Sequence, residues 1–131
     1  MKRRTCLCLC AGVFSSGCLG QTDQPTTKIA WILLVNNRDE ARDVTVFIER
    51  NDEEVFRETH ELGTSVEQST RRIDDPVKGA GHYTVNFDIG DQVVHLHPSE
   101  YADVTEPCLG IQYTFHQQET TGFELKPIDE C

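Results

Sequence analysis

The chain has 131 residues, with 12 Lys and Arg against 22 Asp and Glu, a formal net charge of −10, and 37% hydrophobic residues. This length fits one domain with a modest core. No apolar run approaches the ~20 residues needed to cross a bilayer, which excludes a multi-spanning transporter or channel. The acidic balance argues against a nucleic-acid binder, because neutralising phosphates requires clustered Lys and Arg.

The first 17 residues have the layout of a secretory signal. A cationic start at residues 2–4 precedes the apolar stretch 6–14, and a run of small residues then ends at Cys18. The alternative is a short buried helix, which would leave the three leading positive charges and the polar segment 21–27 unexplained. We therefore expect residues 1–17 to direct export.

This segment resembles a lipoprotein signal peptide. Residues 16–18, Ser-Gly-Cys, match the end of the lipobox, with Ser15 standing where Leu is usual. The resemblance implies cleavage before Cys18 and attachment of a lipid to its sulfur, which places the protein on the outer face of the cell membrane. Residues 3–7 also look like a twin-arginine export signal, with Cys6 where Phe is preferred.

The charge of the processed chain is still more negative. Loss of residues 1–17 removes three of the 12 basic residues and none of the 22 acidic ones, so the remaining 114 residues carry a net charge of −13. Self-repulsion of this size is largely screened near 1 M salt, where the Debye length is about 3 Å. The acidic, Lys-poor composition resembles that of proteins from extreme halophiles. An ordinary acidic secreted domain is the alternative.

Cysteine use agrees with export. Three cysteines lie within the segment to be discarded and act there as small hydrophobic residues. With Cys18 lipidated, Cys108 and Cys131 remain as one pair in a compartment where disulfides persist. They would close a loop of about 23 residues, a crosslink that contributes ~3 kcal/mol on chain-entropy arithmetic.

The processed chain then follows a pattern of strands and turns. Residues 18–27 lack periodicity and are expected to be a tether between the lipid and a domain over 28–131. Residues 28–35 form a dense apolar run that suits a strand buried on both faces. Alternation over residues 43–49, a turn at Asn51-Asp52 and residues 55–59 together predict a hairpin.

Later segments continue this pattern. The nature of residues 62–80 is less clear, with an edge strand expected over 66–73. Further strands are expected over residues 81–87 with Tyr83, Val85 and Phe87 on one face, over 91–97 with Val94 and Leu96 inward, over 109–115, and around Phe123 and Leu125. No sustained helical period is present.

These strands predict an all-β protein, an antiparallel immunoglobulin-like β-sandwich of about seven strands. The order of lipobox, tether, long first strand, Gly-x-Tyr-x-Val-x-Phe strand and terminal hairpin resembles small haloarchaeal lipoproteins with an immunoglobulin-like domain. That class implies no catalytic residues, so we do not expect an enzyme.

The register of the last hairpin bears on the disulfide. If Phe115 faces Phe123, then Cys108 lies opposite Glu130 and misses Cys131 by one residue. A bulge at Gly122 or fraying after Pro127 would bring Cys131 within the Cα separation that a disulfide needs.

One group of side chains, three histidines, could bind a ligand. Pairing Asp88 with Asp91 sets His82 opposite His97 and places His95 on the same face. Two opposed imidazoles could share Zn²⁺ or Cu²⁺, with His95 as a third ligand. The alternative is three solvent-facing polar side chains on the outer face of a sandwich.

Two functions therefore remain. The first is a non-catalytic, lipid-anchored surface domain, with no cofactor, that contacts an envelope protein. The second is an envelope metal carrier for Cu or Zn that uses His82, His95 and His97. Metal analysis of the purified protein separates them.

Overall fold

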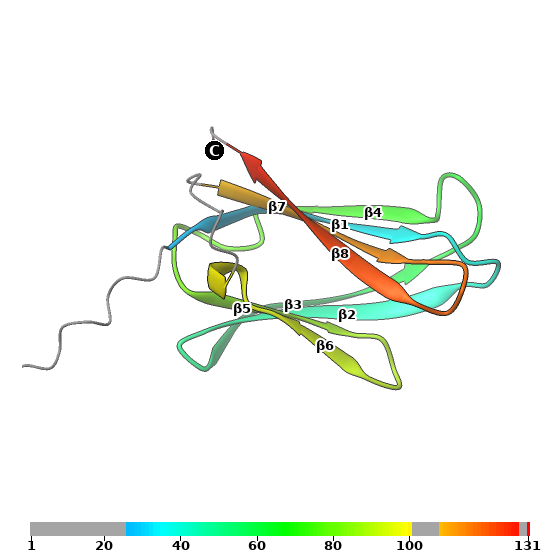
Figure 1. Cartoon of the computed structure of the whole chain (residues 1–131), viewed down its shortest axis with the longest axis horizontal. Helices are drawn as coiled ribbons and strands as arrows, with labels where there is room; N and C mark the ends of the chain where they lie inside the picture. Colours follow the sequence, from blue (N-terminus) through cyan, green and yellow to red (C-terminus); the bar gives the residue numbers. More distant parts are fainter. Residues whose placement is uncertain (1–25, 101–107, 129–130) are drawn as a thin grey trace, which may run out of the picture.

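The computed structural model describes residues 26–100, 108–128 and 131, and these form two packed β-sheets (Figure 1). One sheet has the strand order β4-β1-β7-β8 and the other has the order β3-β2-β5-β6. In chain order the elements are β1 Lys28–Asn36, β2 Arg42–Arg50, β3 Glu53–Leu62, β4 Thr70–Asp74, β5 Tyr83–Asp88, β6 Val93–Leu96, the short 3₁₀ helix η2 Pro98–Glu100, β7 Cys108–Phe115 and β8 Thr121–Ile128.

The predicted β-sandwich is confirmed, with eight strands rather than about seven in the part of the chain described. Neighbouring strands are antiparallel, except that β1 and β7 run parallel. Parallel neighbours cannot be joined by a tight turn. Here the chain passes through the whole second sheet between these two strands.

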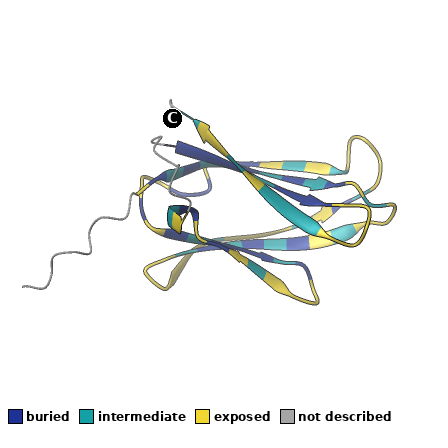
Figure 2. Cartoon of the chain, viewed as in Figure 1, coloured by how far each residue is buried: buried dark blue, intermediate teal, exposed yellow. Residues whose placement is uncertain are grey.

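The core lies between the sheets and consists largely of residues at alternating strand positions. Figure 2 colours the buried residues dark blue. The predicted inward faces of β5 and β7 are confirmed, since Val85, Phe87, Ile111 and Tyr113 are fully buried. Phe87 and Tyr113 stack across the core with their ring centroids 4.2 Å apart. This contact joins the two sheets directly.

Strand β1 departs from the expected burial on both faces. Ile29, Ile32 and Leu34 are fully buried, whereas the outward Trp31 and Leu33 are only half-buried. The register against β7 shifts between Ile29 and Trp31, which indicates a bulge. Among the described residues, no second layer covers the sheet face on which these apolar outward side chains lie.

The hairpin of β2 and β3 turns at the predicted place. Asn51 and Asp52 both have positive φ, 54° and 65°, as the preferred two-residue hairpin turn requires. Strand β3 is longer than expected, because pairing with β2 continues from Glu53 to Leu62.

The edge strand expected over residues 66–73 begins later. Residues 65–69 form a turn in which Ser69 N donates to Ser65 O at 2.9 Å, and Val66 is 91% exposed. Strand β4 therefore covers only Thr70–Asp74, at the edge of its sheet as expected.

Both predicted hairpin registers are wrong by two residues. Val85 pairs with Leu96 in the first hairpin, and Tyr113 pairs with Phe123 in the second. The ladder of the second hairpin is unbroken at Gly122 and places Cys108 opposite Ile128. A shift of two residues keeps every side chain on its face, so the inward positions were still predicted correctly.

Candidate functional site

Four loops gather at one end of the sandwich, which we call the loop end. They are residues 37–41, 63–69, 89–92 and 116–120, and they lie on the right in Figure 1. The opposite end, which we call the disulfide end, carries the start of β1, where Thr27 pairs with Gly81. The first described residues, Thr26 and Thr27, therefore lie at the end remote from the four loops.

Asn36 holds two of these loops together. Its side chain is almost fully buried, and its amide nitrogen donates to the carbonyl oxygens of Glu40, Leu62 and Gly63 at 3.0, 3.3 and 3.1 Å. Its amide oxygen accepts a hydrogen bond from the backbone of Arg38 at 3.0 Å. A buried amide that serves four backbone groups fixes the path of the 37–41 loop against the end of β3.

Arg38 ties the same loop to a third one. Its guanidinium donates to His116 O at 2.9 Å and to Thr120 O at 3.1 Å, and it lies 5.3 Å from the centre of the Phe115 ring. Arg42 approaches the same ring at 5.7 Å. The 37–41 loop is thus held on both sides and presents a preformed surface.

Three clefts open around this loop. The first, of about 490 Å³, lies towards β5 and includes Ala41, Asp43 and Asp88. The second, of about 430 Å³, lies towards the 63–69 loop, and the third, of about 250 Å³, lies towards the 116–120 loop. Their charged lining residues are six acids and three arginines: Asp39, Glu40, Asp43, Glu61, Asp88 and Glu119, with Arg38, Arg42 and Arg71. This excess of carboxylates favours a cationic ligand.

The predicted histidine arrangement is wrong in register. His95 lies opposite Asn86. The same register puts Thr84, rather than His82, opposite His97. His82 precedes β5 and is therefore not opposite His97. Across residues 26–100, 108–128 and 131, no group of three His, Cys, Asp or Glu side chains is placed to hold a metal ion.

His95 and His97 nevertheless lie on one face, as predicted. His95 Nδ1 is hydrogen-bonded to Asn86 Oδ1, and His97 Nδ1 lies 3.1 Å from Thr84 Oγ1. Asn86 is fully buried although it points out of the sandwich. The sequence gives no sign of this burial, which comes from the neighbours of Asn86 on β2 and β6.

The same outer face carries an ion pair on β3. Arg57 donates to the Glu54 carboxylate at 2.9 Å and lies 4.5 Å from the centre of the Phe47 ring. This hydrogen bond lowers the pKa of Glu54 below its usual value. Because both side chains are exposed, the pair stabilises the fold little.

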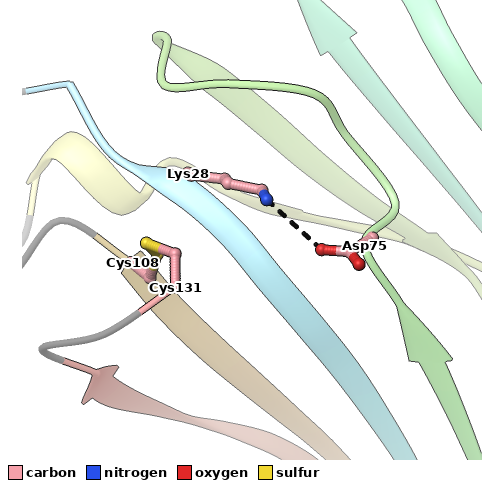
Figure 3. Close-up of a disulfide and its surroundings, with 4 residues drawn as sticks. All are labelled: Lys28, Asp75, Cys108 and Cys131. Atoms are coloured by element: carbon pink, nitrogen blue, oxygen red, sulfur yellow. Dashed lines mark ion pairs between the residues drawn. A yellow bond between two sulfur atoms is a disulfide. The ribbon is translucent and has the colours of Figure 1, made fainter.

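The predicted disulfide is present at the disulfide end (Figure 3). Cys108 and Cys131 are bonded, with their Cα atoms 5.8 Å apart. Next to it, Lys28 at the start of β1 makes an ion pair with Asp75 at 3.3 Å. The predicted lipidation site, Cys18, and the rest of the predicted signal lie outside the described residues.

No helix among the described residues is long and apolar enough to cross a membrane. Comparisons with models of protein families, with curated proteins and with solved structures find no match to this chain.

Sequence reasoning missed the residues that organise the loop end. Asn36 follows an apolar run and suggests only a strand end. Its burial depends on carbonyl groups from residues 62–63, which are distant in sequence. The only local signal is an Asn that ends an apolar strand, and this signal does not reveal its burial.

Proposed function

We propose that this protein is a lipid-anchored, non-catalytic binding module of the outer cell surface and that it binds a partner protein through the loop end. The observation that carries the proposal is the position of Thr26 and Thr27, the first described residues. The described chain enters at Thr26, next to the disulfide end, whereas the three clefts lie at the opposite end. A tether attached to a lipid at Cys18 would leave the loop end facing away from the membrane.

The loop end also has the rigidity of a binding surface. Asn36 and Arg38 fix the 37–41 loop before any partner arrives. Preformed loops lose less conformational entropy on binding. With six carboxylates against three arginines around the clefts, the best partner is a protein segment with clustered Lys or Arg.

The acidic, Lys-poor composition fits the same proposal. We propose that the acidic excess adapts the domain to a saline environment, where exposed carboxylates keep a protein hydrated and soluble. At high ionic strength, attraction to a cationic partner would act only within a few Å. Contact inside the clefts, rather than long-range steering, would then provide the affinity.

Site-specific photocrosslinking in intact cells tests the proposal. Ala41, which borders the two larger clefts, is replaced by a photoreactive amino acid, and Val55, 46% exposed and lining a cleft at the disulfide end, provides the matched control. We expect one discrete adduct from position 41 and none from position 55. Reversing the charge of Asp39 and Glu40 to Lys should weaken that adduct.

Equal adducts from both positions would contradict a loop-end site. Absence of an adduct from position 41, with the variant correctly exported, would contradict binding altogether.

A further inference from the structure

The imidazoles of His95 and His97 are each hydrogen-bonded to a residue of β5 on the exposed face of the β3-β2-β5-β6 sheet. Thr84 and Asn86 are two residues apart on β5, and each is hydrogen-bonded to the histidine opposite it. His95 and His97 are likewise two residues apart. Because alternate residues of a strand share a face, both rings project from the same side of the sheet. Both side chains are exposed to solvent.

The hydrogen bonds of Asn86 determine the tautomer of His95. Its amide nitrogen donates to Phe47 O and to Glu49 Oε1, both at 3.2 Å. These two groups can only accept, so the amide oxygen must face His95. Since that oxygen also only accepts, His95 Nδ1 must carry the proton. In the neutral ring, Nε2 then has a free lone pair directed away from β5.

His97 is held in a similar way. Its Nδ1 is hydrogen-bonded to the Thr84 hydroxyl, which can donate or accept. With the hydroxyl as acceptor, His97 takes the same tautomer as His95, and its Nε2 is also free to bind a ligand. Metal-binding histidines usually have this second hydrogen bond from the opposite ring nitrogen, which orients the ring and raises its basicity.

We propose that His95 Nε2 and His97 Nε2 together bind one divalent transition-metal ion of the kind that prefers neutral imidazole, such as Zn²⁺ or Cu²⁺. This proposal is independent of the proposed function, because His95 on β6 and His97 directly after it do not line the loop-end clefts. No third protein ligand is at hand within the described parts of the chain. Water therefore completes the coordination shell.

The geometry of a strand allows such a chelate. Alternate residues stand roughly 6.6 Å apart along the strand, and each Zn–N bond is about 2.0–2.1 Å long. The two rings must tilt towards each other to share an ion. Their exposure leaves room for this movement. The Glu49 carboxylate, fixed by Asn86, adds negative charge on the same face and favours a cation.

Zn²⁺ titration of the full chain tests the proposal. Cys6, Cys8, Cys10 and Cys18 are first replaced by Ser, so that the remaining sulfurs are those of the Cys108–Cys131 disulfide and Met1. We expect calorimetry to give one Zn²⁺ per chain. We also expect the imidazole nitrogen signals in NMR spectra to place the ion on Nε2 of both histidines.

Variants separate the chelate from nonspecific binding. His95→Gln and His97→Gln should each weaken Zn²⁺ binding at least tenfold, whereas replacement of the exposed His82, just before β5, by Gln should leave it unchanged. Thr84→Val should weaken it about tenfold through the loss of the second hydrogen bond. Because Thr84→Val leaves both histidines in place, it tests the second hydrogen bond without removing a ligand.

Three results would overturn the proposal. The first is unchanged affinity in His95→Gln or His97→Gln, and the second is coordination through Nδ1. The third is one Zn²⁺ per two chains, which would indicate an ion shared between two molecules.

Discussion

The indole of Trp31 on β1 lies directly against Gly110 on β7. The two residues are paired in the parallel ladder, next to the β1 bulge. A Cβ atom built on Gly110 would overlap three carbon atoms of the indole. The guanidinium of Arg72 lies 4.9 Å from the centre of the same ring. The ring is thus held on the outer face between β4 and β7.

Replacing Gly110 by Ala should therefore destabilise the domain. The added methyl group forces Trp31 out of position, and overpacking of this kind costs about 1–3 kcal/mol. The free energy of unfolding from a denaturant titration measures the loss. In the double variant Trp31→Leu, Gly110→Ala, much of the loss caused by Gly110→Ala should disappear, because the two effects share one contact. Full stability of Gly110→Ala alone would contradict the packing described.

Asn36→Ala should weaken the loop end. The substitution leaves the buried carbonyl of Leu62 without its side-chain donor, and an unsatisfied buried polar group costs about 1–3 kcal/mol. Denaturant titration provides the measurement. Asn37→Ala is the matched control, because Asn37 is exposed and its backbone bond to Phe115 persists. Equal effects of the two substitutions would show that Asn36 does not hold the loops.

Stability should fall at alkaline pH because of Tyr113. Burial raises the pKa of its hydroxyl above the usual value. In the unfolded chain the hydroxyl ionises near pH 10, so the contribution to stability is complete below about pH 10 and declines as the pH rises further. Thermal midpoints between pH 8 and 11 should show this decline, and Tyr113→Phe should reduce it. An identical decline in Tyr113→Phe would assign the effect to other groups.

Folding should depend on salt. Screening weakens repulsion within the net charge of −13 carried by residues 18–131, and salts excluded from the surface strengthen apolar burial. The thermal midpoint of that chain, with Cys18→Ser, should be higher in 3 M than in 0.1 M KCl. Replacing the exposed Glu67 and Asp91 by Lys should reduce the difference. Equal midpoints in both salt concentrations would contradict the halophilic interpretation and favour an ordinary acidic domain.

Alternation along each strand was enough to predict the sandwich and its inward faces, because burial repeats every second residue. It could not predict register. Ile89 is nearly buried, and its backbone N–H donates to Gln92 O, so the first hairpin turns over residues 89–92 instead of pairing Asp88 with Asp91. Gly90, with φ of 103°, permits this turn.

The candidate sites were less predictable for the same reason. His95 and His97 were identified from the sequence, but their partners, Asn86 and Thr84, follow from a register that the alternation leaves open. The loop end depends on contacts such as that between Asn36 and Leu62, 26 residues apart. Local patterns carry no information about contacts over such distances.

Membrane fractionation of the full chain and of its Cys18→Ser variant tests the lipid anchor most directly. The unaltered protein should sediment with membranes, and its intact mass should correspond to residues 18–131 plus a lipid. Cys18→Ser should move the protein to the soluble fraction. If Cys18→Ser remains bound to membranes to the same extent, the protein is not a lipoprotein anchored at this cysteine.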